Sequence, residues 1–397
     1  MTGKYEKADP DILLKKLPET EGLDKVKILA DLIHVFRETN PEKVIEFGKQ
    51  GLELLQVAED KELESDILNE LSWAYQCIGG YQTSLEYGIK LLELATEIDD
   101  SQGESSALNK IGGAYLRMAK YDKALEYFIK SLRIRENIDD KHNIGGLYIN
   151  LGTVYYRLGD NKKALDYYNR SIQILEEIDG KDDLATVYNN AGIVYRELGE
   201  YDKALKYQKK ALEIREQLGI EWRIPHSLNN IGAVLNDMKD YNRSLEYFFR
   251  SLEMAKEIGN RPSNVTTLTS IGETYALLNN FAEAKKYVMK GLVIAEEIKA
   301  PDLIRNCYKV MSTILEQKGD FREALEYHKK YKEFYDRIFT EESSEKYNEL
   351  QVSYETEKKE KEKEIYRLRN IELVKANEKL TKALAEVKTL RFLQKDP

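Results

Sequence analysis

Cysteine is nearly absent from the sequence, which contains only Cys77 and Cys307, in segments far apart along the chain. Such sparse use provides no disulfide framework and is typical of proteins kept in a reducing cytosol. Long hydrophobic runs are absent too. None approaches roughly eighteen apolar residues, and the first residues, MTGKYEKADPD, lack the apolar core of a secretion signal. The sequence therefore predicts a cytoplasmic protein with no membrane span and no membrane partner.

A net positive charge is absent, and histidine is scarce. The net charge is −9, whereas a general nucleic-acid binder would need a basic stripe to displace counterions. The four histidines, His34, His142, His226 and His328, are scattered and lack the spacing to cysteine or carboxylate that a metal site needs. We therefore expect no nucleic-acid partner, no metal and no other cofactor.

Catalytic patterns are missing as well. The glycines form no phosphate-binding loop, and the pairs Asp99-Asp100 and Asp139-Asp140 stand where a polar turn would end a helix. We interpret these acidic pairs as turn residues rather than metal ligands. Because no catalytic constellation emerges, the sequence predicts that the protein is not an enzyme.

Repetition is what the sequence has in abundance. The stretch from Leu147 to Ile178 is typical of two short amphipathic helices, and its pattern returns every forty residues from about residue 31 to about residue 338. A fixed period in this range is the signature of a solenoid, in which stacked units share one continuous core. The sequence therefore predicts about eight copies of a helix-turn-helix unit.

Small residues recur at two fixed places in each copy. Glycine inside a helix costs roughly 0.5–1 kcal/mol relative to alanine, so its recurrence indicates a place with no room for a side chain. The first set comprises Gly112, Gly152, Gly192, Gly232 and Gly272, with serine instead at Ser72 and Ser312. The second set, twelve residues later, comprises Ala124, Ala164, Ala204, Ser244 and Ala284. We expect these small residues to let the two helices of a copy approach closely.

These residues carry a family resemblance. The spacing Leu151-Gly152, Tyr155, Ala164, Tyr167-Tyr168 and Ser171 resembles the tetratricopeptide repeat (TPR), and it recurs in register over about three quarters of the chain. The resemblance implies an all-α fold, a right-handed TPR superhelix or α-solenoid of about eight repeats. The period of forty rather than thirty-four, and the missing closing proline, are similar to kinesin light chain and to bacterial TPR signalling proteins.

The pattern changes near residue 341. We divide the chain into a lead-in (1–28), a TPR array (29–340), a coiled-coil helix (341–390) and a tail (391–397). Residues 341–390 contain no Pro or Gly and space their apolar residues by three, four and seven, which predicts a long helix able to form a homodimer. The segment resembles the one that follows TPR arrays in bacterial sensor proteins. Either an effector domain has been lost, or it lies on another chain.

The candidate site is the inner face of the first helices, which in TPR proteins lines a concave groove for a peptide or a partner helix. Asn150, Asn190 and Asn230 recur just before the glycine, and by resemblance such asparagines contact the backbone of a bound peptide. Side-chain amides both donate and accept, so they suit a backbone of any sequence. An equal alternative is that they cap or brace neighbouring helices. The full predicted site comprises Lys110, Arg117, Asn150, Thr153, Arg157, Asn190, Arg196 and Asn230.

The predicted groove carries charges of both signs. Arginines in its earlier half would suit an acidic ligand: Arg117, Arg157 and Arg196. Carboxylates make its later half more acidic: Glu197, Asp237 and Glu273. The alternative is that these charges on the helix faces are simply solvated.

Two functions remain open. The first is a non-catalytic TPR module that binds a peptide or protein segment and relays a signal through the dimerising C-terminal helix. The second is a passive scaffold or adaptor, in which the helix only brings partners together. A related alternative is the remnant sensor region of a bacterial kinase or cyclase that lacks its effector domain.

Overall fold

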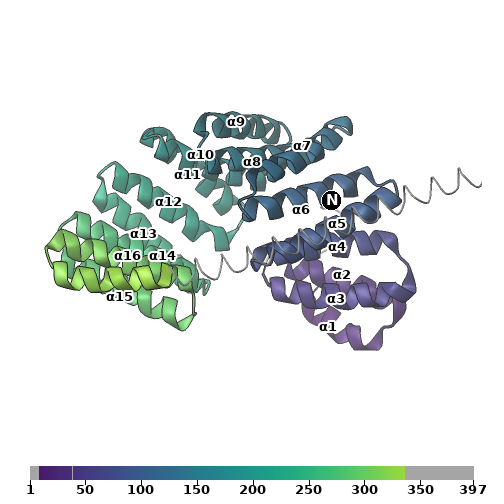
Figure 1. Ribbon diagram of the computed structural model, residues 1–397, viewed down its shortest axis with the longest axis horizontal. Helices are drawn as coiled ribbons and strands as arrows, with labels where there is room; N and C mark the ends of the chain where they lie inside the picture. The colour runs from purple at the N-terminus through teal and green to yellow at the C-terminus, as the bar shows by residue number, and fades with distance from the viewer. Residues whose placement is uncertain (1–8, 38, 336–397) are drawn as a thin grey trace, which may run out of the picture. The chain divides into compact units, whose positions relative to one another are not determined.

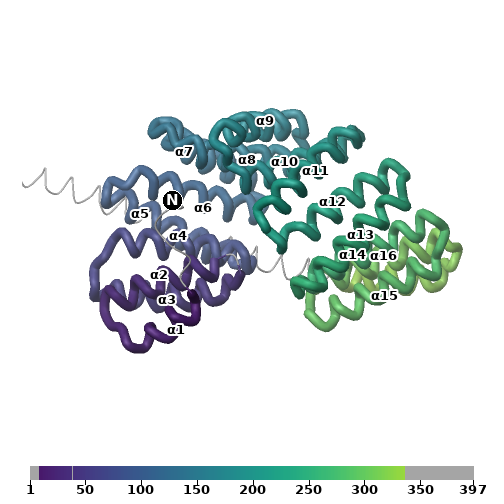
Figure 2. Tube along the Cα trace, turned by 180° about the vertical axis from the view of Figure 1, so that it is seen from behind, coloured from purple at the N-terminus to yellow at the C-terminus, as the bar shows by residue number. Residues whose placement is uncertain are grey.

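The computed structural model describes residues 9–37 and 39–335, so the predicted coiled coil (341–390) and tail (391–397) lie outside the described residues. The described residues up to Lys329 belong to one compact unit. This part of the chain is helical throughout and contains no strand. Consecutive helices lie side by side in chain order (Figures 1 and 2). The prediction of an all-α solenoid is confirmed.

The helices form pairs, each with a first and a second helix. The first helices are α2 (Gly22–Phe36), α4 (Lys61–Cys77), α6 (Ser101–Arg117), α8 (Lys141–Arg157), α10 (Lys181–Glu197), α12 (Ile224–Asp237), α14 (Arg261–Leu277) and α16 (Pro301–Lys318). The second helices are α3 (Pro41–Ala58), α5 (Tyr81–Glu97), α7 (Tyr121–Asn137), α9 (Asn161–Glu177), α11 (Tyr201–Gln217), α13 (Tyr241–Glu257) and α15 (Phe281–Glu297), and residues 321–335 are also helical. A short helix, α1 (Pro10–Lys16), and the 3-10 turn η1 (Leu17–Glu19) precede the pairs, and a second 3-10 turn, η2 (Glu221–Arg223), precedes α12.

The first pair begins earlier than residue 29, where we placed the start of the array. Helix α2 starts at Gly22 and buries Val26 and Leu29 against α3, with Val44 and Phe47 in the same core cluster. The copy was hard to delimit from the sequence because leucine stands at its glycine position. The helix is recognisable only from its packing.

From the end of α3 onward, the turns between helices share one feature. A residue in the left-handed region stands at each twentieth position from 59 to 319: Glu59, Gly79, Asp99, Ala119, Asp139, Gly159, Asp179, Gly199, Gly219, Lys239, Gly259, Asn279, Lys299 and Gly319. The next amide closes the helix, as when Asp100 N–H donates to the Ala95 carbonyl at 2.9 Å. The side chains of Asp100 and Asp140 then cap the helices that follow. The acidic pairs are therefore turn and capping residues, and these turns keep the period constant.

Glycine at the centre of a first helix makes room for a large side chain of the second helix. A Cβ atom on Gly152 would lie 2.5 Å from Tyr168 Cε1, and one on Gly112 would lie 2.7 Å from Phe128 Cδ1. Later copies repeat this pairing: Gly192 with Gln208, Gly232 with Phe248 and Gly272 with Val288. The expected close approach is present, and it also depends on a large side chain sixteen residues after each glycine, which the pattern of small residues did not predict.

The two earliest copies exchange the sizes of this pair. Leu32 and Ser72 occupy the glycine position, and Gly48 and Gly88 occupy the position of the large side chain. The Ser72 hydroxyl also donates to the Ser84 carbonyl at 2.9 Å, so the two helix backbones remain close. One member of each pair must be small because the space between the helices holds only one large side chain.

The first helices lie on the inner side of the stack. Each contacts its own second helix and also the first helix of the next copy, as α4 contacts α6 and α6 contacts α8. In the described part of the chain, second helices of neighbouring copies make no comparable contact. The second helix of each copy also packs on the first helix of the next, as α5 packs on α6, so the first helices take part in all of these contacts between copies and form a continuous row. We define the inner face as Ser106, Lys110, Gly113 and Arg117 of α6 and the equivalent residues of the other first helices.

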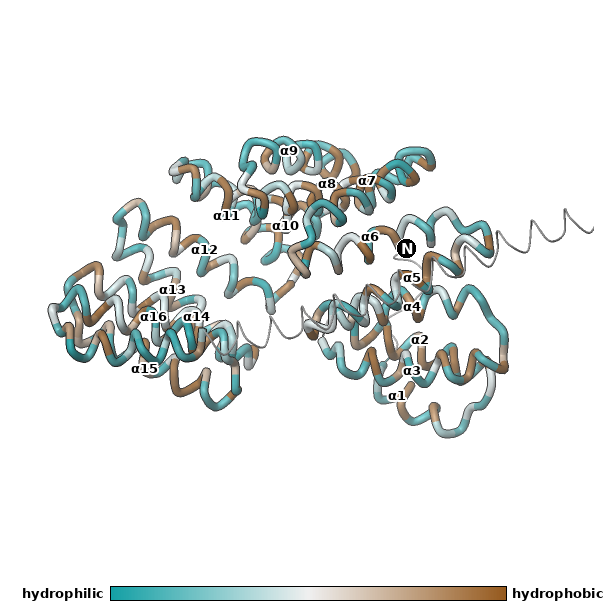
Figure 3. Tube along the Cα trace, viewed as in Figure 1, coloured by the Kyte–Doolittle hydropathy of each residue, from teal (hydrophilic) through white to brown (hydrophobic). Residues whose placement is uncertain are grey.

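Hydropathy follows this packing. Hydrophobic and hydrophilic segments alternate along each helix in Figure 3, as expected when one side of a helix is packed and the other is solvated. In α9 the buried residues are Ala164, Tyr168, Ser171 and Leu175, at helical spacing.

Candidate functional site

The asparagines of the inner face connect successive first helices. Asn150 Nδ2 on α8 donates to Asn109 Oδ1 on α6 at 2.9 Å, and Asn230 Nδ2 on α12 donates to Asn189 Oδ1 on α10 at 2.8 Å. These bonds brace neighbouring copies. Each amide nitrogen carries two hydrogens, so the brace uses only part of what Asn150 can donate.

Asn190 differs from the other two asparagines. The position on α8 that would hold its partner is Ile149, which has no amide group. Its Oδ1 accepts from Asn189 Nδ2 at 3.3 Å, and its own Nδ2 donates no hydrogen bond within residues 9–37 and 39–335. Asn190 is half-buried, so its amide hydrogens are placed on the inner face without an internal acceptor.

Thr153 and Lys110 are both half-buried and held by their surroundings. The Thr153 hydroxyl donates to the Ile149 carbonyl at 2.8 Å and lies 3.2 Å from the Tyr168 hydroxyl. Burial lowers the pKa of Lys110 below its ordinary value, a shift that Glu70 opposes and Arg37 increases. Because the Thr153 hydroxyl is already hydrogen-bonded within the protein, Thr153 contributes mainly to the shape of the inner face.

The Lys110 end of the inner face is a charged cluster. Arg37 Nε lies 3.0 Å from Glu70 Oε2, and the Arg37 guanidinium lies 5.5 Å from the centre of the Trp73 ring. Two cations, Arg37 and Lys110, thus surround one carboxylate. This end of the inner face keeps a local positive charge.

The predicted arginines are exposed at the ends of the first helices. Arg196 pairs with Asp237 on the next first helix, so its charge is already compensated. The Arg157 guanidinium lies 5.9 Å from the centre of the Tyr156 ring, and the Tyr156 hydroxyl donates to Glu197 at 2.5 Å. Burial and this hydrogen bond raise the pKa of Tyr156 to about 12. Tyr156–Glu197 thus connects α8 with α10, and Arg196–Asp237 connects α10 with α12.

A further cluster, which the repeat pattern does not predict, lies at the start of α12. There the 3-10 turn η2 replaces the first turn of the helix. Arg223 reaches back to α10, where its Nη1 lies 3.3 Å from Thr186 Oγ1 and 3.5 Å from the exposed carboxylate of Asp182. His226 follows on α12, and its Nδ1 lies 3.3 Å from Asn230 Nδ2. The cluster therefore adjoins the asparagine row.

Arg215 of α11 lies beneath this cluster. It is only 5% exposed, and its Nη1 donates at 2.5 Å to the hydroxyl of Ser227, the residue after His226. No carboxylate among the described residues forms an ion pair with Arg215, and its buried Nε has no hydrogen-bond partner there. Burial, with Arg223 nearby, lowers the pKa of Arg215 to about 10. Burial and these two arginines also lower the pKa of His226.

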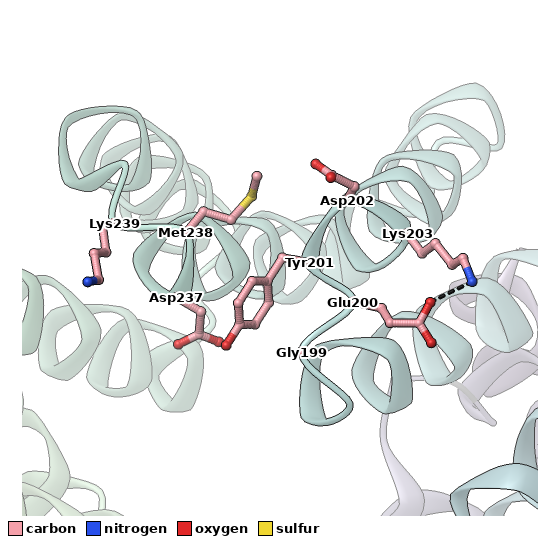
Figure 4. A pocket seen from close by; sticks show the side chains of 8 residues that line it. All are labelled: Gly199, Glu200, Tyr201, Asp202, Lys203, Asp237, Met238 and Lys239. Atoms are coloured by element: carbon pink, nitrogen blue, oxygen red, sulfur yellow. Dashed lines mark ion pairs between the residues drawn. The ribbon is translucent and has the colours of Figure 1, made fainter.

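An open depression of about 560 Å³ lies elsewhere, between the turns that follow α10 and α12. Figure 4 shows its lining residues, 199–203 and 237–239, and the ion pair between Glu200 and Lys203. Its charged side chains do not converge on one point, so we assign it no ligand.

Across the described ranges, no group of histidine, cysteine and carboxylate residues could hold a metal ion. Nor is any helix there both long enough and apolar enough to cross a membrane.

Comparison with known proteins identifies the repeat. The family model described as tetratricopeptide repeat matches residues 63–137, 103–177, 143–217 and 223–297, which together make up more than half of the chain. The break in these matches, at residues 218–222, includes part of η2. No curated protein matches the sequence.

Several solved structures share the fold. The apo form of the quorum sensor NprR from B. thuringiensis is 15% identical, with a TM-score of 0.62 over 82% of this chain and 97% of that one. A Rap protein complexed with competence and sporulation factor is 13% identical, with a TM-score of 0.53 over 84% and 100%. A STAND signal transduction ATPase with a TPR sensor, from Pyrococcus horikoshii, is 21% identical, with a TM-score of 0.56 over 85% and 53%. At these identities the likeness concerns the fold alone.

Proposed function

Since the chain belongs to the tetratricopeptide repeat family, we propose that it is a non-catalytic, cytoplasmic interaction module whose inner face binds a peptide or protein segment. The observation that carries this proposal is the asparagine row on the inner face, above all Asn190. A half-buried amide without an internal acceptor is suited to bond the backbone of an extended ligand. The named neighbours support the proposal, because one is a quorum sensor and another was solved with a bound factor.

Binding would not require chemistry. A ligand that spans several first helices can change how the copies sit on one another, which is a shift between conformations that the array already samples. We propose that residues 341–390 form a homodimer and pass this change to an output partner. Scaffolding without relay is the second candidate, and it predicts that ligand binding leaves the dimer affinity of the full chain unchanged.

Selection of a displayed library of random peptides on the full chain tests the binding proposal. The affinity of a selected peptide is then measured by calorimetry for wild type and for Asn190→Ala. Loss of one or two backbone hydrogen bonds should weaken binding by about 1–2 kcal/mol, or roughly five- to thirtyfold. Equal affinity for both would remove Asn190 from the site.

Bracing and ligand contact need a matched control. Asn109→Ala removes the α6–α8 brace from its other side and leaves Asn150 in place. If Asn150 contacts ligand, Asn150→Ala should weaken binding clearly more than Asn109→Ala. If both variants weaken binding equally, the asparagine acts only as a brace, and its assignment to the binding site fails.

A further inference from the structure

Helix α14 has a more polar buried side than the other first helices. Four of its polar side chains are buried, Asn264, Thr267, Thr269 and Thr274, whereas no other first helix in the described part of the chain buries more than two. At three of these positions α10 has apolar residues: Leu184, Val187 and Val194. Since apolar burial is the main force that holds a helix in place, α14 is held to its neighbours less firmly than α10.

The hydroxyl groups of α14 also bond the backbone of their own helix. Five of them donate to the carbonyl four residues earlier, those of Thr266, Thr267, Thr269, Ser270 and Thr274. Each other described helix has at most one such bond, as α8 has at Thr153. These bonds compete with the helical amides for the carbonyls and favour bending, and threonine has low helix propensity. Helix α14 is therefore the first helix most easily bent.

The polar ties between α10 and α12 are not repeated between α12 and α14. The two ties are Asn189–Asn230 and Arg196–Asp237. At the positions of Asn230 and Asp237, forty residues later, α14 has Ser270 and Leu277. The Ser270 hydroxyl donates to the Thr266 carbonyl of its own helix at 3.1 Å, and Leu277 is 45% exposed. Neither residue reaches back to α12 with a polar group.

The asparagines of α12 consequently keep unpaired oxygens. Asn229 Nδ2 donates to Thr267 Oγ1 at 2.7 Å, and Asn236 Nδ2 donates to Thr274 Oγ1 at 2.8 Å. The Oδ1 atoms of Asn229, Asn236 and Asn264 are buried and accept no hydrogen bond within residues 9–37 and 39–335. An unpaired buried carbonyl is costly, and water would pair these oxygens if α12 and α14 moved apart. Opening of this contact therefore recovers part of its own cost.

We propose that α14 is the hinge of the array, at which the copies up to α13 change their angle to the copies that follow. The contact between α12 and α14 opens, and water replaces the bonds between asparagine and threonine. The pivot is the contact of α13 with α14, because Phe248 and Leu252 pack there against Leu268 and Ile271 in an apolar cluster. Hinges of this kind absorb a change of angle in a few residues while the packed bodies on each side stay intact. The inference goes beyond the proposed function, since the hinge is a property of the chain without ligand.

The test measures distances across the hinge in the full chain without ligand. Equivalent exposed positions of α9, α11, α13 and α15 receive cysteines with spin labels in two pairs, Gln173 with Glu253 and Glu213 with Val293. The first pair spans α10 and α12, and the second spans α12 and α14. The background is Cys77→Ser, and this chain without added cysteines reports any label on buried Cys307. Pulsed EPR should give a distance distribution roughly twofold wider for the second pair than for the first.

One substitution should close the hinge. Ser270→Asn supplies the amide donor that Asn229 Oδ1 lacks, as Asn230 does for Asn189. It should narrow the distribution of the second pair to that of the first. Ser270→Asp has nearly the same shape but no amide hydrogen, so it should leave the second distribution wide. The comparison of the two pairs in the Cys77→Ser background does not depend on the folding of either variant.

Three outcomes would overturn the inference. Equal widths for the two pairs in the chain without ligand would show that α14 is no more flexible than the helices before it. A wide second pair that Ser270→Asn leaves unchanged, or that Ser270→Asp narrows equally, would refute the role of the missing tie. Fast amide exchange throughout α15 and α16 would show that the width comes from unfolding of the last copies instead. Peptide binding that depends on Asn190 is measured separately, so the hinge can fail while the proposed function stands.

Discussion

Two glycines of α8 are expected to respond to the same substitution in opposite ways. A Cβ atom on Gly146 would meet nothing within 4 Å, whereas one on Gly152 would lie 2.5 Å from Tyr168 Cε1 and 3.1 Å from the Ala164 carbonyl oxygen. Alanine at either position gains helix propensity of roughly 0.5–1 kcal/mol. Gly146→Ala should therefore stabilise the protein by about this amount.

Gly152→Ala adds a steric cost to the same gain. Overpacking of a filled contact costs about 1–3 kcal/mol, and the carbonyl at 3.1 Å is backbone that cannot turn aside. Because the propensity term cancels between the two variants, Gly152→Ala should be less stable than Gly146→Ala by about 1–3 kcal/mol. Stacked copies can unfold in parts, so the assay is hydrogen exchange of amides in α8 and α9.

A double substitution at the contact between residues 152 and 168 tests the same size rule. The second copy tolerates Ser72 at the glycine position because Gly88 stands opposite, so Tyr168→Gly should be less harmful in a Gly152→Ser chain than in wild type. If the amides of α8 and α9 are equally protected from exchange in Gly152→Ala and Gly146→Ala, the size rule for this contact is wrong. It is also wrong if the losses of stability caused by Gly152→Ser and Tyr168→Gly simply add in the double variant.

Two further predictions concern pH. Hydrogen bonds from Asn143 and the charge of Arg135 outweigh burial and hold the pKa of Asp140 below its ordinary value, so the stability it contributes should be lost as pH falls below about 4. Asp140→Asn keeps a cap but leaves Arg135 unpaired, and urea titration at neutral pH should show a loss of about 3 kcal/mol; a loss below about 1 kcal/mol would contradict the pairing. Tyr156 behaves in the opposite sense: its pKa rises from about 10 in the unfolded chain to about 12, so its contribution is present below pH 10 and is lost between these values. Between pH 9 and pH 12 the free energy of unfolding should fall less steeply with pH in Tyr156→Phe than in wild type. Identical slopes would contradict the Tyr156–Glu197 bond.

Much of the fold could be predicted because the repeat fixes it locally. The glycine that recurs every forty positions is visible in the sequence and marks a close contact between helices. The left-handed turn residue every twenty positions is not, because glycine, alanine, lysine and aspartate all occupy it. The partner of the glycine was less visible, since Phe128, Tyr168, Gln208 and Val288 share only their bulk. The first pair was hardest to place because Leu32 and Gly48 exchange the sizes on which the pattern depends.

The candidate site was predictable in position but not in its bonds. The period puts Asn150, Asn190 and Asn230 on one face, yet it cannot say that Asn150 and Asn230 brace the neighbouring copy while Asn190 lacks a partner. That difference comes from a residue forty-one positions earlier, which is asparagine in two copies and Ile149 in the third. The cluster at α12 was missed because His226 was judged by its neighbours in sequence.

Hydrogen exchange of the full chain with and without a library-selected peptide tests binding to the inner face most directly. Peptide should slow exchange in the first helices α8, α10 and α12 and leave the second helices α9 and α11 much less affected. Protection confined to the second helices, or to the turns between them, would contradict the account.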